Sequence, residues 1–169
     1  MIPTLTTDRL TLRGPVPEDF APYALVFASD RSVYMDGPLN RTQAWHEFAA
    51  DTIGWQLFGY GYWTIADTAS NDVLGFLGFA SPPYYPELEL GWMVTAQAEG
   101  KGIAFEAASA ARDFGFNVLG RDSFVSYIDP PNIRSRALAE RLGATLDPDA
   151  DAPSEGDLVY RHHKPGGQP

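Results

Sequence analysis

The segment Glu99–Ala104, with the sequence EGKGIA, places two glycines and a lysine directly before an alanine-rich stretch. A helix that begins here would present unpaired backbone N–H groups and the positive end of its dipole, which together attract phosphate. Gly100 and Gly102 carry no Cβ atom that would hold a diphosphate away from those amides. Lys101 adds a positive charge at the rim. The segment therefore predicts a phosphate-binding turn, with a purely structural turn as the alternative.

Two common phosphate loops do not fit this segment. The Walker form requires Ser or Thr after its Gly-Lys pair, and here Gly102 follows Lys101. The dinucleotide form requires a third glycine where Phe105 stands, and it is expected near the start of a domain. A nucleotide-dependent enzyme is therefore disfavoured.

The elements around the loop alternate between strand and helix patterns. Thr42 is a plausible N-cap of the second helix and Gly143 a C-terminal cap of the last one. Hairpins and crossovers together indicate an α+β domain with a mixed sheet. Strands are predicted at 9–14, 60–67, 72–80, 87–94, 123–128 and 158–163, and helices at 16–29, 42–59, 103–114 and 132–144.

Composition limits the class of protein. The 169 residues fit one domain, predicted over 1–164, with a flexible tail at 165–169. No apolar stretch approaches the roughly 18–20 residues of a membrane span, and the N-terminus lacks the order of a secretory signal, so a cytoplasmic location is expected. The chain has no cysteine, which excludes disulfides and a cysteine nucleophile, and with no spaced His/Asp set no metal site is predicted.

Charge is distributed unevenly along the chain. The net charge of −10 argues against nucleic acid or an anionic membrane as the main partner. No lysine or arginine occurs between Thr42 and Gly100, whereas Glu47, Asp51 and Glu89 are among the acidic residues there. The segment between Thr42 and Gly100 is therefore suited to bind a cationic ligand. Alternatively, its acidic residues serve only to keep the surface soluble.

The order of these segments resembles the GNAT superfamily of acetyl-CoA-dependent N-acetyltransferases. The similar parts are the strand ELGWMV, the loop AEGKGIA, and a later helix that begins Asn132-Ile133-Arg134-Ser135. The opening TDRLTLRGPVPEDF is similar to the RimJ/RimL-type branch, which acetylates protein N-termini and small amines. The resemblance covers about Leu5 to His162. It implies a mostly antiparallel sheet of six to seven strands with about four helices, splayed at the cofactor strand.

The resemblance also implies how acetyl-CoA is held. The family loop has Gln or Arg, then two residues, Gly, one residue, and Gly or Ala; Glu99 departs from this pattern. Met93 and Val94 would pair with the pantetheine arm as an added strand does, and a backbone amide near Val94 would meet the oxyanion. The diphosphate would lie against the loop, whose cofactor-binding residues are Glu99, Gly100, Lys101, Gly102, Ile103 and Ala104.

The helix that follows Asp129-Pro130-Pro131 is implied to reach the sulfur end of the arm. Asn132 would bond the arm there, with Ser135 beside it; Asn132 is equally a natural helix N-cap. Many relatives carry a tyrosine that protonates the leaving thiolate where this chain has Ala139, so Ser135 is the expected acid. A CoA thiol is also acidic enough that no acid is needed.

Acetyl transfer to nitrogen requires a free amine and therefore a base. Glu89 lies where many family members carry the base, and Glu87, two residues earlier, is its rival on the same strand face. The two carboxylates could instead simply attract a cationic acceptor.

The expected function is direct transfer of an acetyl group to a primary amine in a ternary complex. The expected acceptor is a protein or peptide N-terminal α-amine, because its pKa of about 7.7–8 is far below that of lysine. A small amine, such as an amino acid or polyamine, and a non-catalytic acyl-CoA-binding domain remain alternatives. The sequence does not determine the oligomeric state, and a homodimer is one possibility.

Overall fold

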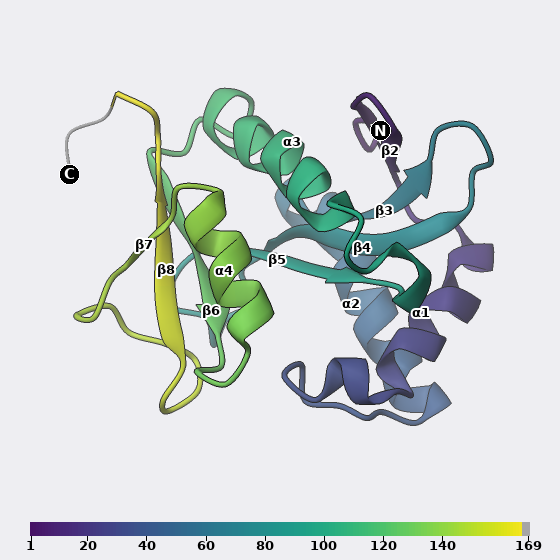
Figure 1. Ribbon diagram of the computed structural model, residues 1–169, viewed down its shortest axis with the longest axis horizontal. Helices are drawn as coiled ribbons and strands as arrows, with labels where there is room; N and C mark the ends of the chain where they lie inside the picture. The colour runs from purple at the N-terminus through teal and green to yellow at the C-terminus, as the bar shows by residue number, and fades with distance from the viewer. Residues whose placement is uncertain (167–169) are drawn as a thin grey trace.

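The computed structural model describes residues 1–166, in which eight strands form one sheet (Figure 1). The strand order is β1-β2-β3-β4-β5-β6-β8-β7, and every neighbouring pair is antiparallel except β5 and β6. The predicted mixed, mostly antiparallel sheet is confirmed. The strands are β1 Leu5–Thr6, β2 Leu10–Arg13, β3 Tyr62–Asp67, β4 Val73–Ala80, β5 Glu89–Val94, β6 Ser123–Ile128, β7 Thr145–Leu146 and β8 Leu158–His163.

No residue range was predicted for two of these strands, β1 and β7. Each has two residues and lies at one edge of the sheet. A two-residue strand shows no alternation in the sequence, so periodicity cannot detect it. Residues 167–169, in the segment predicted as a flexible tail, lie outside the described residues.

Four α-helices cover the sheet. They are α1 Phe20–Phe27, α2 Arg41–Phe58, α3 Ile103–Asn117 and α4 Ile133–Arg141, with short 3-10 turns η1 Pro17–Asp19, η2 Asp30–Ser32 and η3 Ala96–Ala98. Helices α3 and α4 lie on one face, and α1 and α2 lie on the other (Figure 1). No described helix is both long and apolar enough to cross a bilayer.

The N-terminus of α2 differs from the prediction at Thr42. The helix begins at Arg41 because the Oδ1 atom of Asn40 accepts hydrogen bonds from the N–H groups of Thr42 and Gln43, both at 3.0 Å. The Gln43 side chain accepts from the Asn40 N–H in return, which completes a capping box. Gly143, in the left-handed region at φ +85°, follows α4 as predicted.

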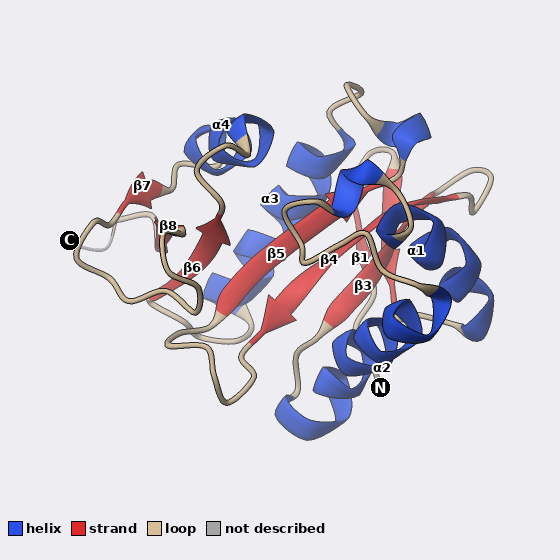
Figure 2. Cartoon of the chain, turned by 90° about the horizontal axis from the view of Figure 1, so that it is seen from below, coloured by secondary structure: helices blue, strands red, loops and turns tan. Residues whose placement is uncertain are grey.

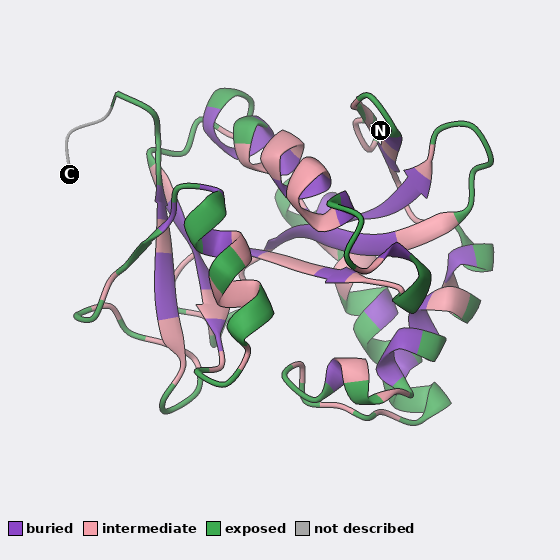
Figure 3. Cartoon of the chain, in the orientation of Figure 1, coloured by how far each residue is buried: buried purple, intermediate pink, exposed green. Residues whose placement is uncertain are grey.

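Apolar side chains fill the space on both faces of the sheet. Beneath α3, the core includes the buried residues Trp63, Leu90 and Ala107. Beneath α1 and α2, a second cluster gathers around Tyr23 and Phe76. Figure 3 shows this burial along the central strands and the inner side of α3. The central strands are thus fixed from both sides, and their exposed ends can carry a site.

Candidate active site

Strands β5 and β6 are joined at only one end. Glu89 pairs with Val125, the Val125 N–H donates to the Leu88 carbonyl at 3.0 Å, and the Ser126 hydroxyl donates to the Leu90 carbonyl at 2.6 Å. Beyond Leu90 the two strands separate, and β6 pairs with β8 over its full length (Figure 2). Residues 91–94 therefore keep an open backbone edge, which we call the fork. The splay expected beside this strand is present.

The phosphate-binding turn predicted at Glu99–Ala104 lies just past the end of β5. Gly100 and Gly102 have φ values of +72° and +76°, a backbone region that residues other than glycine rarely adopt. Gly102 is the N-cap of α3, and no side chain caps this end of the helix. The first-turn N–H groups of Ile103 and Ala104 therefore have no partner within the helix. This uncapped, glycine-lined helix start fits a diphosphate.

Glu99, the departure from the family pattern, is neutralised by two arginines. Its carboxylate forms salt bridges with Arg31, which follows α1, and with Arg134, on α4. Hydrogen bonds and charges from these two arginines lower the pKa of Glu99, and the hydrogen bond from Arg31 has the largest effect. The Nε atom of Arg31 also donates to the Val94 carbonyl at 3.1 Å. The cluster has a net charge of +1 and links the end of β5 to α4 across the fork.

The residues predicted to hold the arm lie along the fork. Met93 is buried beneath α1, and Val94 is partly buried at the end of β5. The Val94 carbonyl is occupied by Arg31, so one of the backbone groups expected to pair with the arm has a partner.

Asn132 is the N-cap of α4, and Ser135 on that helix contacts β5. The Asn132 Oδ1 atom accepts from the Ser135 N–H at 3.2 Å, so the N-cap role is present and the amide nitrogen stays available. The Ser135 hydroxyl accepts from Nε1 of Trp92 on β5 at 3.3 Å, which ties α4 to the opposite wall of the fork. Ala139 is fully buried in the core below α4.

The structure separates the two rival carboxylates. Glu87 lies before β5, not on the same strand face as Glu89, and forms a two-pronged salt bridge with Arg161, both contacts being 2.7 Å. This pairing lowers the pKa of Glu87 and makes it a structural anion. Burial raises the pKa of Glu89 to about 8, and the Asp51 and Asp157 charges add to this effect. A carboxyl group that titrates near neutral pH is suited to act as a base.

Acidic and tyrosine side chains surround Glu89 on the α1/α2 face of the sheet. Asp51, on α2, accepts a hydrogen bond from the Tyr23 hydroxyl at 2.7 Å. Burial, together with the Glu47 charge, raises the pKa of Asp51 to about 7. Tyr85, in the loop before β5, is half-buried and packs edge-on against Tyr127. The region without lysine or arginine noted in the sequence thus lies around the candidate base.

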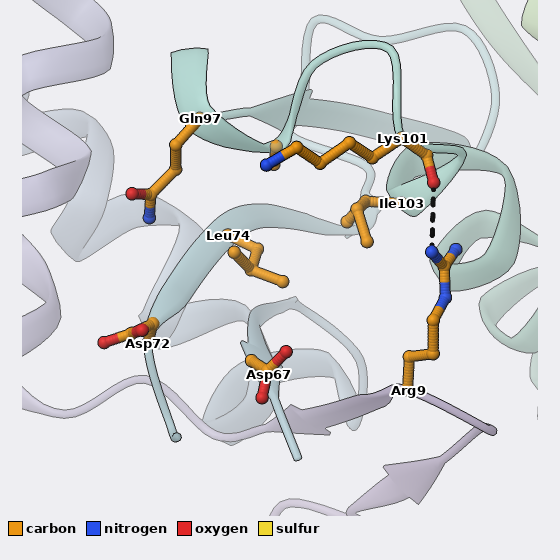
Figure 4. Close-up of a pocket in the computed structure, with 8 residues that line it drawn as sticks. Arg9, Asp67, Asp72, Leu74, Gln97, Lys101 and Ile103 are labelled. Atoms are coloured by element: carbon orange, nitrogen blue, oxygen red, sulfur yellow. Dashed lines mark hydrogen bonds between the residues drawn. The ribbon is translucent and has the colours of Figure 1, made fainter. Parts of the chain in front are cut away.

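Two surface hollows flank the phosphate turn, one on each side of Arg9. The first has a volume of about 300 Å³, and Asp67 and Asp72 line it opposite Lys101 (Figure 4). Its two carboxylates make it a poor place for phosphate. The second has a volume of about 450 Å³ and is lined by Gly102, Phe105 and Arg141, among others. It opens beside the helix start, and it too is lined by two carboxylates, Asp8 and Glu106, of which Glu106 is paired with Arg9.

Sequence reasoning missed the role of three side chains near Glu89: Tyr23, Asp51 and Tyr62. Asp51 was noticed only as part of an acidic stretch. The available signal for Tyr62 was a glycine inside each of two neighbouring strands, Gly78 and Gly91, because such glycines often mark a close approach. No group of three or more His, Cys, Asp or Glu side chains in residues 1–166 is placed to hold a metal ion.

Comparisons with known proteins identify the family and the fold. The chain is 43% identical to the acetyltransferase from Agrobacterium tumefaciens str. C58, with a TM-score of 0.94 over 97% of this chain and 96% of that one. A structure named as a GnaT-family acetyltransferase from Bordetella pertussis is 27% identical, with a TM-score of 0.78 over 94% and 98%. The protein YkkB of Bacillus subtilis (strain 168) is 29% identical over 148 residues, 82% of this chain and 83% of YkkB.

The family model described as "Acetyltransferase (GNAT) domain" matches residues 9–145. This range contains the fork, the uncapped start of α3 and Glu89. GNAT enzymes use acetyl-CoA. The chain is a member of the GNAT acetyltransferase family.

Proposed function

We propose that this GNAT enzyme transfers the acetyl group of acetyl-CoA directly to a primary amine, and that the acceptor is a peptide or protein N-terminal α-amine, as in the RimJ/RimL-type branch. The observation that carries the proposal is Glu89, a carboxyl group with its pKa raised to about 8 at the closed end of the fork. A base in this position can take a proton from an amine that attacks a thioester held along β5.

Each wall of the fork contributes to holding the cofactor. The amides of Lys101 to Ala104 bind the diphosphate, with Glu99 and Gly100 shaping the turn before them. Met93 and Val94 lie along the arm, and Asn132 presents its free amide nitrogen to the sulfur end, with Ser135 beside it as hydrogen-bond donor. Acetyl-CoA supplies the activated acetyl group; the chain orients it and removes the proton. With no cysteine in the sequence, an acetyl-cysteine intermediate is excluded.

The acceptor approaches from the α1/α2 face, where Glu89 and Asp51 lie. An α-amine with a pKa of about 7.7–8 is matched to a base of pKa about 8, whereas a lysine amine near 10.4 is not. A small amine with a second positive charge is the rival, and the half-buried Asp51 is the observation in its favour because it is a second anion beside the base.

A panel of acceptors tests the proposal. Peptides with free N-termini, the same peptides with blocked N-termini, polyamines and free amino acids are each incubated with acetyl-CoA, and thiol release and product mass are measured. We expect turnover with free N-termini and none with the blocked forms. Turnover of polyamines alone would favour the small-amine alternative, and CoA binding without turnover of any amine would indicate a non-catalytic domain.

A further inference from the structure

The side chain of Tyr62 crosses the sheet along a path cleared by two glycines. Tyr62 on β3 is opposite Gly78 on β4, which is opposite Gly91 on β5. A Cβ atom on Gly78 would stand 2.3 Å from the Tyr62 Cα, and one on Gly91 would stand 2.1 Å from the Tyr62 hydroxyl oxygen. Any other residue at either position would collide with β3 or with the phenol. The glycines therefore let a β3 side chain reach β5, two strands away.

The phenol ends at the closed end of the fork. Gly91 is the first residue beyond Leu90, where β5 and β6 separate. The point that a Gly91 Cβ would occupy is 2.1 Å from the Tyr62 hydroxyl and 3.8 Å from the carboxyl carbon of Glu89. The hydroxyl and the candidate base thus lie side by side where an arm inserted along residues 91–94 would present its thioester. No hydrogen bond among residues 1–166 uses the Tyr62 hydroxyl, which leaves it available to a ligand.

The chemistry of this phenol favours hydrogen-bond donation over proton transfer. Burial, with the charges of Glu89 and Asp51, raises the pKa of Tyr62 well above its usual value. A thiol has a pKa of about 8.5, so a phenol this reluctant to ionise does not protonate a leaving thiolate. It keeps its proton, and a neutral O–H group can stabilise negative charge that develops on a nearby oxygen.

We propose that Tyr62 is a catalytic residue whose hydroxyl donates a hydrogen bond to the acetyl carbonyl oxygen during transfer. This inference rests on the proposed function. The amine nitrogen forms a bond to the carbonyl carbon, and negative charge moves onto the carbonyl oxygen, where Tyr62 meets it. The carbon–sulfur bond then breaks and its electron pair leaves with the sulfur, while Glu89 takes the proton of the amine. Tyr62 neither gains nor loses a proton.

Tyr62→Phe tests the role because it removes the hydroxyl and keeps the ring. Tyr60→Phe, in the loop just before β3, is the matched control, since its ring stacks on Phe58 and does not reach β5. We expect kcat to fall about 100-fold in Tyr62→Phe, with the Kd of acetyl-CoA and the Tm close to those of the parent. A kcat within threefold of the parent would refute the catalytic role, as would a loss explained by weaker acetyl-CoA binding.

A double-mutant cycle with Gly91→Ala tests the placement of the hydroxyl. When Tyr62 is present, the Cβ atom of the new alanine displaces the Tyr62 hydroxyl. In Tyr62→Phe the nearest ring atom is 3.3 Å from that Cβ position, so the methyl group nearly fits. We expect Gly91→Ala to lower kcat strongly in the parent and by less than threefold in Tyr62→Phe. If Gly91→Ala lowers kcat by the same factor in the parent and in Tyr62→Phe, the two substitutions act independently and the placement of the hydroxyl is refuted. If Gly91→Ala fails to fold, Tyr62→Phe alone decides, and a parent that acetylates no amine would refute the proposed function instead.

Discussion

Replacing Glu89 by glutamine should change both the pH dependence of catalysis and the stability of the fold. The pKa of Glu89 is about 8, so at pH 7 only about one site in ten carries the carboxylate that can act as base. With both substrates saturating, the kcat of the parent should rise about tenfold from pH 7 to a plateau above pH 9. Glu89→Gln should be slow throughout and should lack this inflection, because glutamine has no ionisable group.

The same pKa predicts the direction of the stability change. The folded pKa of Glu89 lies above the unfolded value of 4.5, so the folded state holds the proton more tightly. Its contribution to stability is complete below about pH 4.5 and is lost as the pH rises to about 8. At about 1.4 kcal/mol for each pKa unit, ionisation costs the folded state up to about 5 kcal/mol. Glu89→Gln removes that cost, so it should be more stable than the parent at pH 8.5 and nearly equal to it at pH 4.5.

Urea unfolding at the two pH values, together with kcat profiles from thiol release, measures both effects. Glu155→Gln is the matched control, because Glu155 is exposed in the loop before β8. A Glu89→Gln enzyme that keeps the parent's inflection near pH 8 would show that another group is the base. A variant that is less stable than the parent at pH 8.5 would contradict the desolvation of the carboxyl group.

Three further changes test the loop and its surroundings. Glu99→Gln should tighten CoA binding about fivefold in calorimetry, because it releases Arg31 and Arg134 to the phosphates; weaker binding would contradict the role given to this cluster. Gly102→Ala should lower the free energy of unfolding by about 1 kcal/mol and weaken CoA binding at least tenfold. The control Gly120→Ala, equally strained at φ +65°, should lower only the stability. A Gly102→Ala variant that binds CoA as tightly as the parent would argue against the amide site. Glu87→Gln should cost about 1–2 kcal/mol of stability by weakening the Arg161 pair, and a loss of the kcat inflection would show that the two carboxylates had been assigned wrongly.

The sequence predicts the parts of this molecule that depend on local pattern. The apolar stripe from Ile103 to Phe114 is the buried side of α3, and the β3–β4 hairpin follows from two branched, aromatic runs around a short turn. The helix start at Asn40 was missed because Asn40 and Thr42 are both good caps, and only the return hydrogen bond from Gln43 decides between them.

Long-range contacts determine what the sequence does not reveal. Period-two alternation put Glu87 and Glu89 on one face, but the pair with Arg161, 74 residues away, holds Glu87 outside β5. The neutralisation of Glu99 depends on Arg31, 68 residues away. Tyr62 reaches the site only through the register of three strands, which no single segment encodes.

A crystal structure with acetyl-CoA bound would show whether the glycine turn before α3 binds the diphosphate. We expect diphosphate oxygens within hydrogen-bond distance of the N–H groups of Gly102, Ile103 and Ala104, with the arm along residues 91–94 and the acetyl group beside Glu89. A diphosphate bound elsewhere, with the Glu99 bridge to Arg134 still closed over an empty turn, would contradict it.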